Sequence, residues 1–184
     1  MVNGITCQQL SLTVGIILLN RLASRCGVII DSDSYAFPRP EDLARIEPAN
    51  LRQLGYSGNK ARALIELATS VATGRLNLED LERLDNAECV ERLVVIKGVG
   101  RWTAEYVLLR GLGRINIFPG DDVGARNSLE RWLRLRKKLD YQRTEQVLSK
   151  WRDYGGLIFF HLLLKGLSEA RIFAGDEHRL PASA

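Results

Sequence analysis

The stretch L-V-V-I-K-G-V-G-R-W-T-A-E-Y, from Leu93 to Tyr106, constrains the fold more than any other part of this chain. It places two glycines around one valine, with an apolar run before them and a helical run after them. Gly98 and Gly100 can adopt backbone conformations that other residues avoid, and they let another chain come very close. The stretch therefore predicts two helices joined by a tight turn, a helical hairpin.

The start of the second helix of this hairpin is suited to an anion. The first N–H groups of a helix have no partner within it, and the helix dipole adds partial positive charge there. We therefore expect a site for one phosphate group, formed by Gly98, Gly100, Arg101 and Thr103. The alternative is a plain helix-to-helix turn with no ligand.

Nearly every other segment has the apolar spacing and the end residues typical of helices. Ser57 is placed to cap a long helix that Gly74 ends, and Asp85 with Glu88 resembles a capping box. We find no alternating strand pattern, so the sequence predicts an all-α fold. The expected helices cover residues 6–26, a short segment from 40, 48–54, 58–73, 86–96, 101–112, a segment from about 121, 141–154 and 155–170.

The size and composition are those of a globular protein. The 184 residues fit one domain or two closely packed lobes, and 46% of them are hydrophobic. The apolar run from Leu10 to Leu19 has no basic residue before it and is shorter than the roughly 20 residues of a membrane span, so we expect a buried helix and no membrane association. Cys7, Cys26 and Cys89 match neither a disulfide framework nor a metal motif, which indicates reduced thiols in a cytosolic protein.

Positive charge is concentrated in one segment. The segment from Arg126 to Arg152 contains nine basic residues and three acidic ones, which gives it a net charge of +6. The net charge of the whole chain is +4, so the rest of the chain carries −2. A basic face on a slightly acidic body favours contact with nucleic acid. A solvated helix face remains the alternative.

Two groups of residues can carry chemistry. Asp121 and Asp122 follow Pro119-Gly120 and precede a helix, so one of them should cap it, and the helix start favours their ionised form. Such a carboxylate can stabilise a neighbouring cation or orient a water, although a simple cap is the alternative. Trp102 and Tyr106 lie four residues apart and share one helix face, where they can stack on a flat base or pack in a core.

Four segments in the same order resemble the helix-hairpin-helix DNA glycosylases, in particular the 3-methyladenine DNA glycosylase II branch. They are I-T-C-Q-Q-L-S from Ile5, I-K-G-V-G-R-W-T-A-E-Y from Ile96, F-P-G-D-D from Phe118 and W-R-D-Y from Trp151. The similarity runs from about residue 5 to residue 170. It implies two helical lobes with the active-site cleft between them, without the N-terminal sheet domain of larger relatives.

The resemblance also implies a role for individual residues. Asp122 is the implied catalytic aspartate, and Asp121 caps the helix beside it. Gln9 is the implied wedge, the side chain that fills the gap left by an extruded base. The residues implied to line the base pocket are Trp102, Tyr106, Phe160 and His161. Those implied to hold a monovalent cation, Na⁺ or K⁺, through backbone carbonyls are Val94, Ile96 and Val99.

The implied activity is that of a monofunctional glycosylase, which removes alkylated purines and leaves an abasic site. Bifunctional relatives carry a lysine where this chain has Trp102, and tryptophan cannot form a Schiff base, so no lyase activity is expected. The four-cysteine motif of the endonuclease III branch is missing, so we expect no iron–sulfur cluster and no required cofactor. The alternative function is a non-catalytic module that binds damaged DNA.

These inferences give an expected organisation. An opening helix over residues 1–27 packs with the C-terminal lobe, a central lobe covers 28–117 with the hairpin at 93–106, and the C-terminal lobe covers 118–184. The expected partner is double-stranded DNA with alkylated bases. We expect a monomer in the cytoplasm of a prokaryote, with the nucleoid, or in a eukaryotic nucleus.

Overall fold

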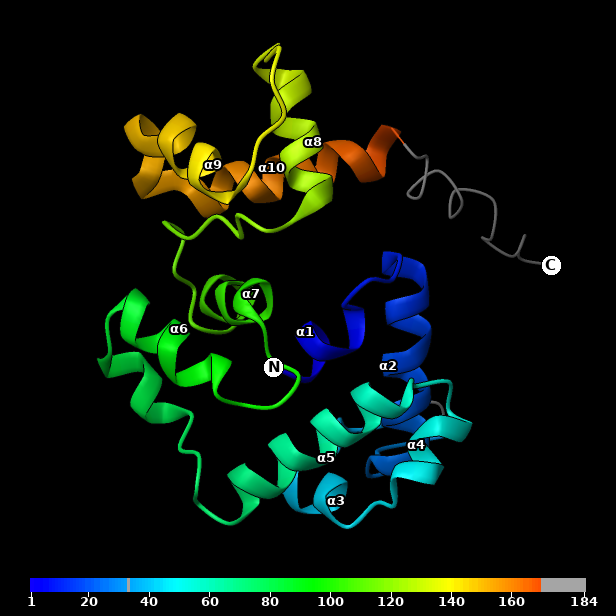
Figure 1. The fold of residues 1–184 in the computed structure, drawn as a ribbon. Helices are drawn as coiled ribbons and strands as arrows, with labels where there is room; N and C mark the ends of the chain where they lie inside the picture. Colours follow the sequence, from blue (N-terminus) through cyan, green and yellow to red (C-terminus); the bar gives the residue numbers. More distant parts are fainter. Residues whose placement is uncertain (33, 170–184) are drawn as a thin grey trace, which may run out of the picture. The chain divides into compact units, whose positions relative to one another are not determined.

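A computed structural model describes residues 1–32 and 34–169, and the chain divides into two units, Met1–Leu112 and Gly113–Ala184 (Figure 1). The described residues are helical apart from loops and one isolated antiparallel bridge between Ile29 and Tyr35, which confirms the all-α prediction. The first unit contains the residues of the predicted opening helix and residues 28–112 of the predicted central lobe. The packing of residues 1–27 with the C-terminal lobe and the cleft between lobes stay predictions. Residues 170–184 of the predicted C-terminal lobe lie outside the described residues.

In the first unit, α5 packs against α3, α4 and α1, while α7 packs against α6 and α1 (Figure 1). Its helices are α1 (Val2–Cys7), α2 (Leu12–Cys26), α3 (Pro40–Ala44), α4 (Pro48–Gln53), α5 (Gly58–Ala72), a 3-10 helix (Glu79–Arg83), α6 (Asn86–Val94) and α7 (Arg101–Gly111). Burying one leucine or isoleucine stabilises a fold by about 1.5–3 kcal/mol. Large side chains fully buried in this unit are Ile5, Leu22, Leu51, Leu64, Leu81, Leu93 and Leu108.

The single helix predicted over residues 6–26 is wrong, because the chain breaks between α1 and α2. Gln9 has a φ of 54°, a left-handed conformation that no helix continues through. Ser11 then caps α2 by accepting a hydrogen bond from the N–H of Val14. The end of α2 at Cys26 is as predicted, and Gly27 follows it.

The predicted caps of the first unit are confirmed. Ser57 accepts a hydrogen bond from the N–H of Lys60 at 3.3 Å and begins α5. Asp85 accepts from the N–H of Glu88 at 2.9 Å, and the Glu88 carboxylate accepts from the N–H of Asp85 at 2.8 Å. Each of these contacts lies within one helical turn, so local sequence is enough to specify it. The helix α6 ends at Val94, two residues before the predicted Ile96.

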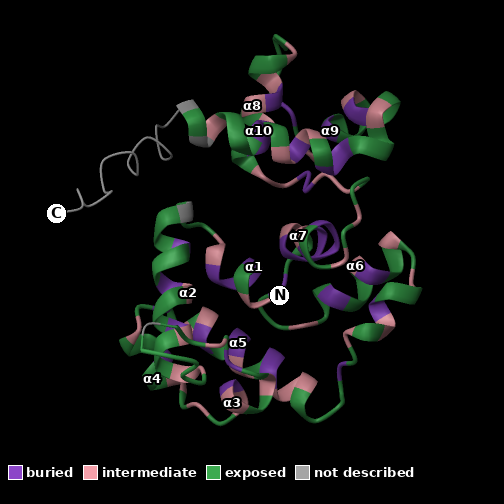
Figure 2. Ribbon diagram, turned by 180° about the vertical axis from the view of Figure 1, so that it is seen from behind, coloured by how far each residue is buried: buried purple, intermediate pink, exposed green. Residues whose placement is uncertain are grey.

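The second unit contains α8 (Val123–Trp132), α9 (Tyr141–Leu148), a 3-10 helix (Ser149–Tyr154) and α10 (Gly155–Glu169). The helix predicted over residues 141–154 is therefore shorter, since Trp151 has non-helical dihedral angles inside the 3-10 segment. Buried residues, purple in Figure 2, lie on the inner sides of α8, α9 and α10. The buried core of this unit is made of Leu129, Leu139, Leu148 and Leu162.

No helix among the described residues has the length and apolar character needed to cross a membrane.

Glu130 ties α8 to the loop that follows it, and this predicts a pH-dependent stability. Its carboxylate accepts the N–H of Leu139 at 2.7 Å and lies 3.4 Å from the ammonium of Lys138. The hydrogen bond from Leu139, more than the charge of Lys138, lowers the pKa of Glu130 below its ordinary 4.5. Because folding favours the ionised form, the carboxylate stabilises the protein above pH 4.5 and loses this effect as the pH falls through the lowered pKa.

Glu130→Gln should therefore lower the free energy of unfolding at neutral pH, and its difference from the wild type should shrink in acid. Urea unfolding at several pH values measures this. Glu145→Gln on α9, where the side chain is exposed, is the matched control and should change little at any pH. A difference for Glu130→Gln that does not depend on pH would contradict the assignment.

Candidate functional site

The two glycines of the hairpin have different structural tasks. Gly98 has a φ of 86°, and a Cβ atom built there would lie 2.5 Å from the Cβ of Ala63 on α5. Any larger residue at Gly98 would thus be strained twice, in its backbone and against α5. Gly100 is the N-cap of α7 with a φ of −93°, and a Cβ atom there would meet nothing within 4 Å. Gly98 makes the turn possible, whereas Gly100 leaves the start of α7 open for close approach.

The start of α7 keeps the features expected of a phosphate site, with one correction. Gly98, Gly100 and Arg101 are exposed, and α7 begins at Arg101. Thr103, in contrast, is 1% exposed, and its hydroxyl accepts a hydrogen bond from the Gln8 amide at 2.7 Å. The Thr103 hydroxyl is therefore used by Gln8 inside the protein, and Thr103 lacks the exposure of the other three residues.

The loop over residues 8–11, here called the opening loop, is attached to the hairpin and to α5. The Gln8 amide donates to the carbonyl of Gly98 at 2.9 Å as well as to Thr103. The ammonium of Lys60 donates to the carbonyls of Thr6 at 2.7 Å and Gln8 at 2.6 Å. Gln9, the predicted wedge, follows these attachments directly and is exposed.

Sequence reasoning did not identify Gln8 and Lys60. Lys60 lies one turn before Leu64 and two turns before Leu67, both buried, so a cation on the apolar face of α5 was a usable signal. Burial lowers the pKa of Lys60, and the nearby Cys7 thiol partly opposes this effect. Gln8 carries no comparable signal.

The carbonyls predicted to hold a monovalent cation lie where α6 gives way to the turn. Val94 is the last residue of α6, and the final carbonyls of a helix have no partner within it. The carbonyl oxygen of Ile96 accepts a hydrogen bond from the N–H of Val99 at 2.9 Å. A carbonyl oxygen has two lone pairs, so one of them is still available to a cation. Backbone carbonyl oxygens are suitable ligands for a hard cation, so the residues fit the group.

The two predicted aromatic residues of α7 are in contact with each other. The rings of Trp102 and Tyr106 are stacked, with centroids 5.1 Å apart and planes at 17°. The guanidinium of Arg110, one further turn along, lies 5.6 Å from the Tyr106 centroid. Both rings are half-buried. The three side chains thus form a continuous platform along one face of α7.

The two acidic residues sit on a turn that the second unit holds firmly. Pro119 is fully buried, and a Cβ atom on Gly120 would lie 2.8 Å from the ring of Tyr141. The carboxylate of Asp122 accepts the N–H of Ala125 at 2.8 Å and so caps α8. The prediction that Asp121 is this cap is therefore wrong, because the helix begins one residue later than that role requires.

The start of α10 fixes the segment before the acidic residues. The N–H of Gly156 donates to the carbonyl of Ile115 at 2.7 Å. Phe118 and Phe159 make an edge-to-face contact with centroids 5.7 Å apart. Phe160 is half-buried and makes an edge-to-face contact with Phe159, with ring centroids 6.0 Å apart, whereas His161 is exposed. Consecutive residues point about 100° apart around a helix, so Phe160 and His161 face different directions.

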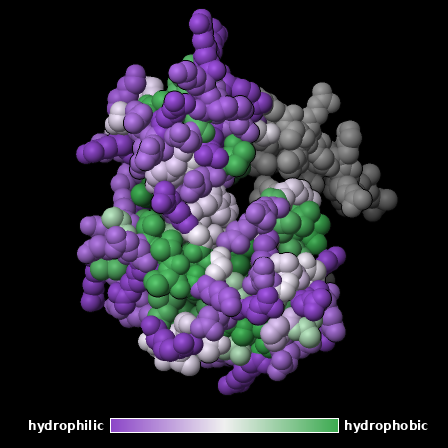
Figure 3. Space-filling view, viewed as in Figure 1, coloured by the Kyte–Doolittle hydropathy of each residue, from purple (hydrophilic) through white to green (hydrophobic). Residues whose placement is uncertain are grey.

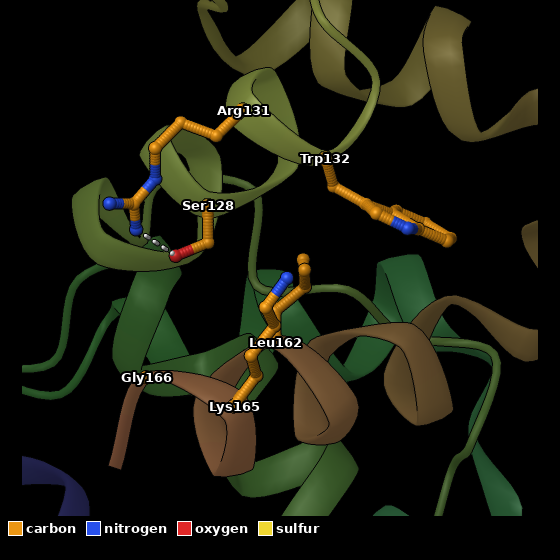
Figure 4. Close-up of a pocket in the computed structure, with 6 residues that line it drawn as sticks. All are labelled: Ser128, Arg131, Trp132, Leu162, Lys165 and Gly166. Atoms are coloured by element: carbon orange, nitrogen blue, oxygen red, sulfur yellow. Dashed lines mark hydrogen bonds between the residues drawn. The ribbon is translucent and has the colours of Figure 1, made fainter. Parts of the chain in front are cut away.

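The predicted basic surface is present in the second unit, whose visible face is largely hydrophilic (Figure 3). Of the nine basic residues between 126 and 152, all except Arg126 are exposed. A hollow of about 150 Å³ lies between α8 and α10, and at its edge Arg131 donates to the Ser128 hydroxyl at 3.2 Å. Figure 4 draws the residues that line it. The hollow is lined by Ser128, Arg131, Trp132, Leu162, Lys165 and Gly166. Two cations and an indole suit an anionic group, but no predicted site residue lies here.

Comparison with known proteins decides the family. The family described as HhH-GPD superfamily base excision DNA repair protein matches residues 2–153. This chain belongs to the HhH-GPD superfamily. The match includes the opening loop, the hairpin and Asp122, and it ends before Phe160 and His161.

Several of the similar proteins are named as 3-methyladenine DNA glycosylases. The putative DNA-3-methyladenine glycosylase YfjP of Bacillus subtilis is 32% identical over 154 residues, 84% of this chain and 53% of that protein. A 3-methyladenine DNA glycosylase structure from Archaeoglobus fulgidus superposes with a TM-score of 0.77 at 30% identity, over 89% of this chain and 56% of that one. The structure of the Schizosaccharomyces pombe 3-methyladenine DNA glycosylase Mag1 in complex with abasic DNA superposes with a TM-score of 0.72 at 29% identity. The superposition covers 86% of this chain and 76% of that one. This chain spans about half the length of the first of these relatives.

Proposed function

We propose that this protein is a monofunctional DNA glycosylase of base excision repair. It hydrolyses the N-glycosidic bond of an alkylated purine, of the 3-methyladenine or 7-methylguanine type, and leaves an abasic site. The observation that carries the proposal is the Asp122 carboxylate, which is held at the start of α8 by a rigid turn in a chain that matches the HhH-GPD family. The names of the similar proteins support the choice of substrate class.

DNA binding is assigned to the hairpin and the basic surface. The exposed Gly100 and the open start of α7 let a phosphate approach the backbone, and Arg101 adds a cation. The basic residues of the second unit add sequence-independent attraction that salt weakens. Such contacts position a duplex without reading its sequence, as a repair enzyme requires.

The chemistry needs few groups. A purine alkylated at N3 or N7 is already cationic, so the bond to C1′ breaks with its electron pair leaving on the base, which becomes neutral. Asp122 stabilises the positive charge that develops on the sugar. A water adds its oxygen to C1′ and loses a proton. The Trp102 ring, stacked on Tyr106, offers a cationic base on its outer face an attraction of roughly 0.5–2 kcal/mol.

The carbonyls of Val94, Ile96 and Val99 would hold a monovalent cation in the hairpin. Such an ion would supply positive charge beside the phosphate site. We place the protein with genomic DNA, as a monomer in the cytoplasm of a prokaryote or in a nucleus.

Base release from methylated duplex DNA tests the function. Purified protein should free 3-methyladenine or 7-methylguanine, identified by mass spectrometry, and leave abasic sites that alkali cleaves. Unmodified duplex is the control and should release no base. Borohydride should trap no covalent complex, because Trp102 cannot form a Schiff base. Tight binding without any base release would favour the damage-binding module, and a trapped complex would favour a lyase.

A further inference from the structure

We infer that Lys60 and Gln8 form a brace that positions Gln9 for insertion into the DNA stack. The inference rests on the proposed function, because it assigns the conformation of the predicted wedge to two residues that do not touch the lesion. Both act as positioning residues in the first unit.

The brace joins three elements. Lys60, on α5, reaches the end of α1 through hydrogen bonds to the carbonyls of Thr6 at 2.7 Å and Gln8 at 2.6 Å. A cation donating to two carbonyls makes charge-assisted hydrogen bonds, which are about twice as strong as neutral ones. The Gln8 amide extends the chain of contacts to Gly98 and Thr103 at the start of α7. Both sides of Gln8, its carbonyl and its amide, are thus fixed.

The residue that follows this anchor has a conformation that needs support. Gln9 has a φ of 54°, a left-handed conformation that is strained for a residue other than glycine. Such a conformation persists only where the surroundings determine it. On one side the brace fixes Gln8, and on the other Ser11 caps α2. The Gln9 side chain is exposed between them.

A fixed wedge has an energetic purpose. Extrusion of a nucleotide costs the free energy of its stacking and pairing. A side chain whose backbone is already positioned offsets this cost with a smaller loss of conformational entropy on binding. The same Gln8 amide bonds the hairpin carbonyl of Gly98, so the wedge and the phosphate site keep a constant separation.

The test uses the full chain with Lys60→Met, which keeps an unbranched side chain but removes the donors. The probe is a duplex with a stable abasic analogue, and 2-aminopurine opposite it reports insertion of a side chain. Binding of the wild type should change the fluorescence, and Lys60→Met should lose most of the change while it still binds. Gln9→Ala gives the reference for a lost wedge. Arg62→Met is the control, since Arg62 is exposed on the same helix and donates a hydrogen bond to its neighbour Asn59 at 2.6 Å, not to the opening loop.

Excision under single-turnover conditions provides a second measurement. Lys60→Met should slow excision from a fully paired duplex about tenfold, since a small misplacement is costly. A lesion in an unpaired bulge should be affected much less, because no stack has to be opened. Lys60→Met combined with Gln9→Ala should be no slower than Gln9→Ala alone, as expected for residues that act through one wedge. Gln8→Met tests the same brace from the other side and covers the case in which Lys60→Met does not fold.

Two results would overturn the brace. One is an unchanged fluorescence response in Lys60→Met and Gln8→Met, and the other is an equal loss of excision from paired and bulged substrates. Failure of the proposed function is a different outcome, in which the wild type releases no base from any substrate. The fluorescence measurement still decides on the brace in that case, because it requires no catalysis.

Discussion

Asp122→Asn should lower the rate of base release by about 10²–10³-fold or more, as removal of one preorganised electrostatic partner does in other enzymes. The amide keeps the size of the carboxylate but has no charge to stabilise the developing cation on the sugar. Binding to DNA should remain, because the hairpin and the basic surface are untouched. Single-turnover excision of 7-methylguanine, with binding measured on an abasic analogue, gives both quantities.

The fold should survive this change. Asp122 caps α8 through one hydrogen bond from Ala125, and asparagine is as good an N-cap as aspartate. Asp140→Asn is the matched control. Asp140 caps α9 in the same unit by accepting the N–H of Arg143, also at 2.8 Å. The same chemical change at this second cap should leave excision unaffected.

Two outcomes would refute the role of Asp122. Unchanged release of the alkylated base by Asp122→Asn would show that its charge is not used. A loss of excision in Asp140→Asn as large as that in Asp122→Asn would show that helix capping, not charge at the lesion, explains the effect.

Gly98→Ala should lower the free energy of unfolding by about 2–5 kcal/mol, because it combines backbone strain with overpacking. The native φ of 86° is unfavourable for alanine, and the new Cβ would lie 2.5 Å from the Cβ of Ala63. Urea unfolding of the full chain measures the loss. DNA affinity should also fall, because the carbonyl of Gly98 is the point at which Gln8 holds the hairpin.

Gly100→Ala is the control for this prediction. Its φ is −93° and no atom lies within 4 Å of the added Cβ, so the unfolding free energy should change by less than about 1 kcal/mol. Ala63→Gly combined with Gly98→Ala should recover part of the stability, since it removes the clash but not the backbone strain. Equal effects of the two glycine substitutions would contradict the different tasks assigned to them.

The errors in the expected fold have a common physical origin. The break between α1 and α2 depends on Gln9, whose left-handed conformation follows from contacts of its neighbours with α5 and α7. The sequence Q-Q-L-S continues an apolar helical pattern, so periodicity alone predicted one helix. The choice between Asp121 and Asp122 as the cap depends similarly on the burial of Pro119 and on the fit of Gly120 against Tyr141.

The sequence by itself was sufficient to predict the all-α class, the caps at Ser57 and Asp85, the hairpin and the family resemblance. Each of these is read from short motifs, whose residues lie a few positions apart. Only the tertiary structure revealed the attachment of the opening loop. Its hydrogen bonds join residues 90 positions apart, from Gln8 to Gly98, and 52 apart, from Lys60 to Gln8. Packing of α1, α5 and α7 brings these groups together, and no local pattern encodes a contact across that length of chain.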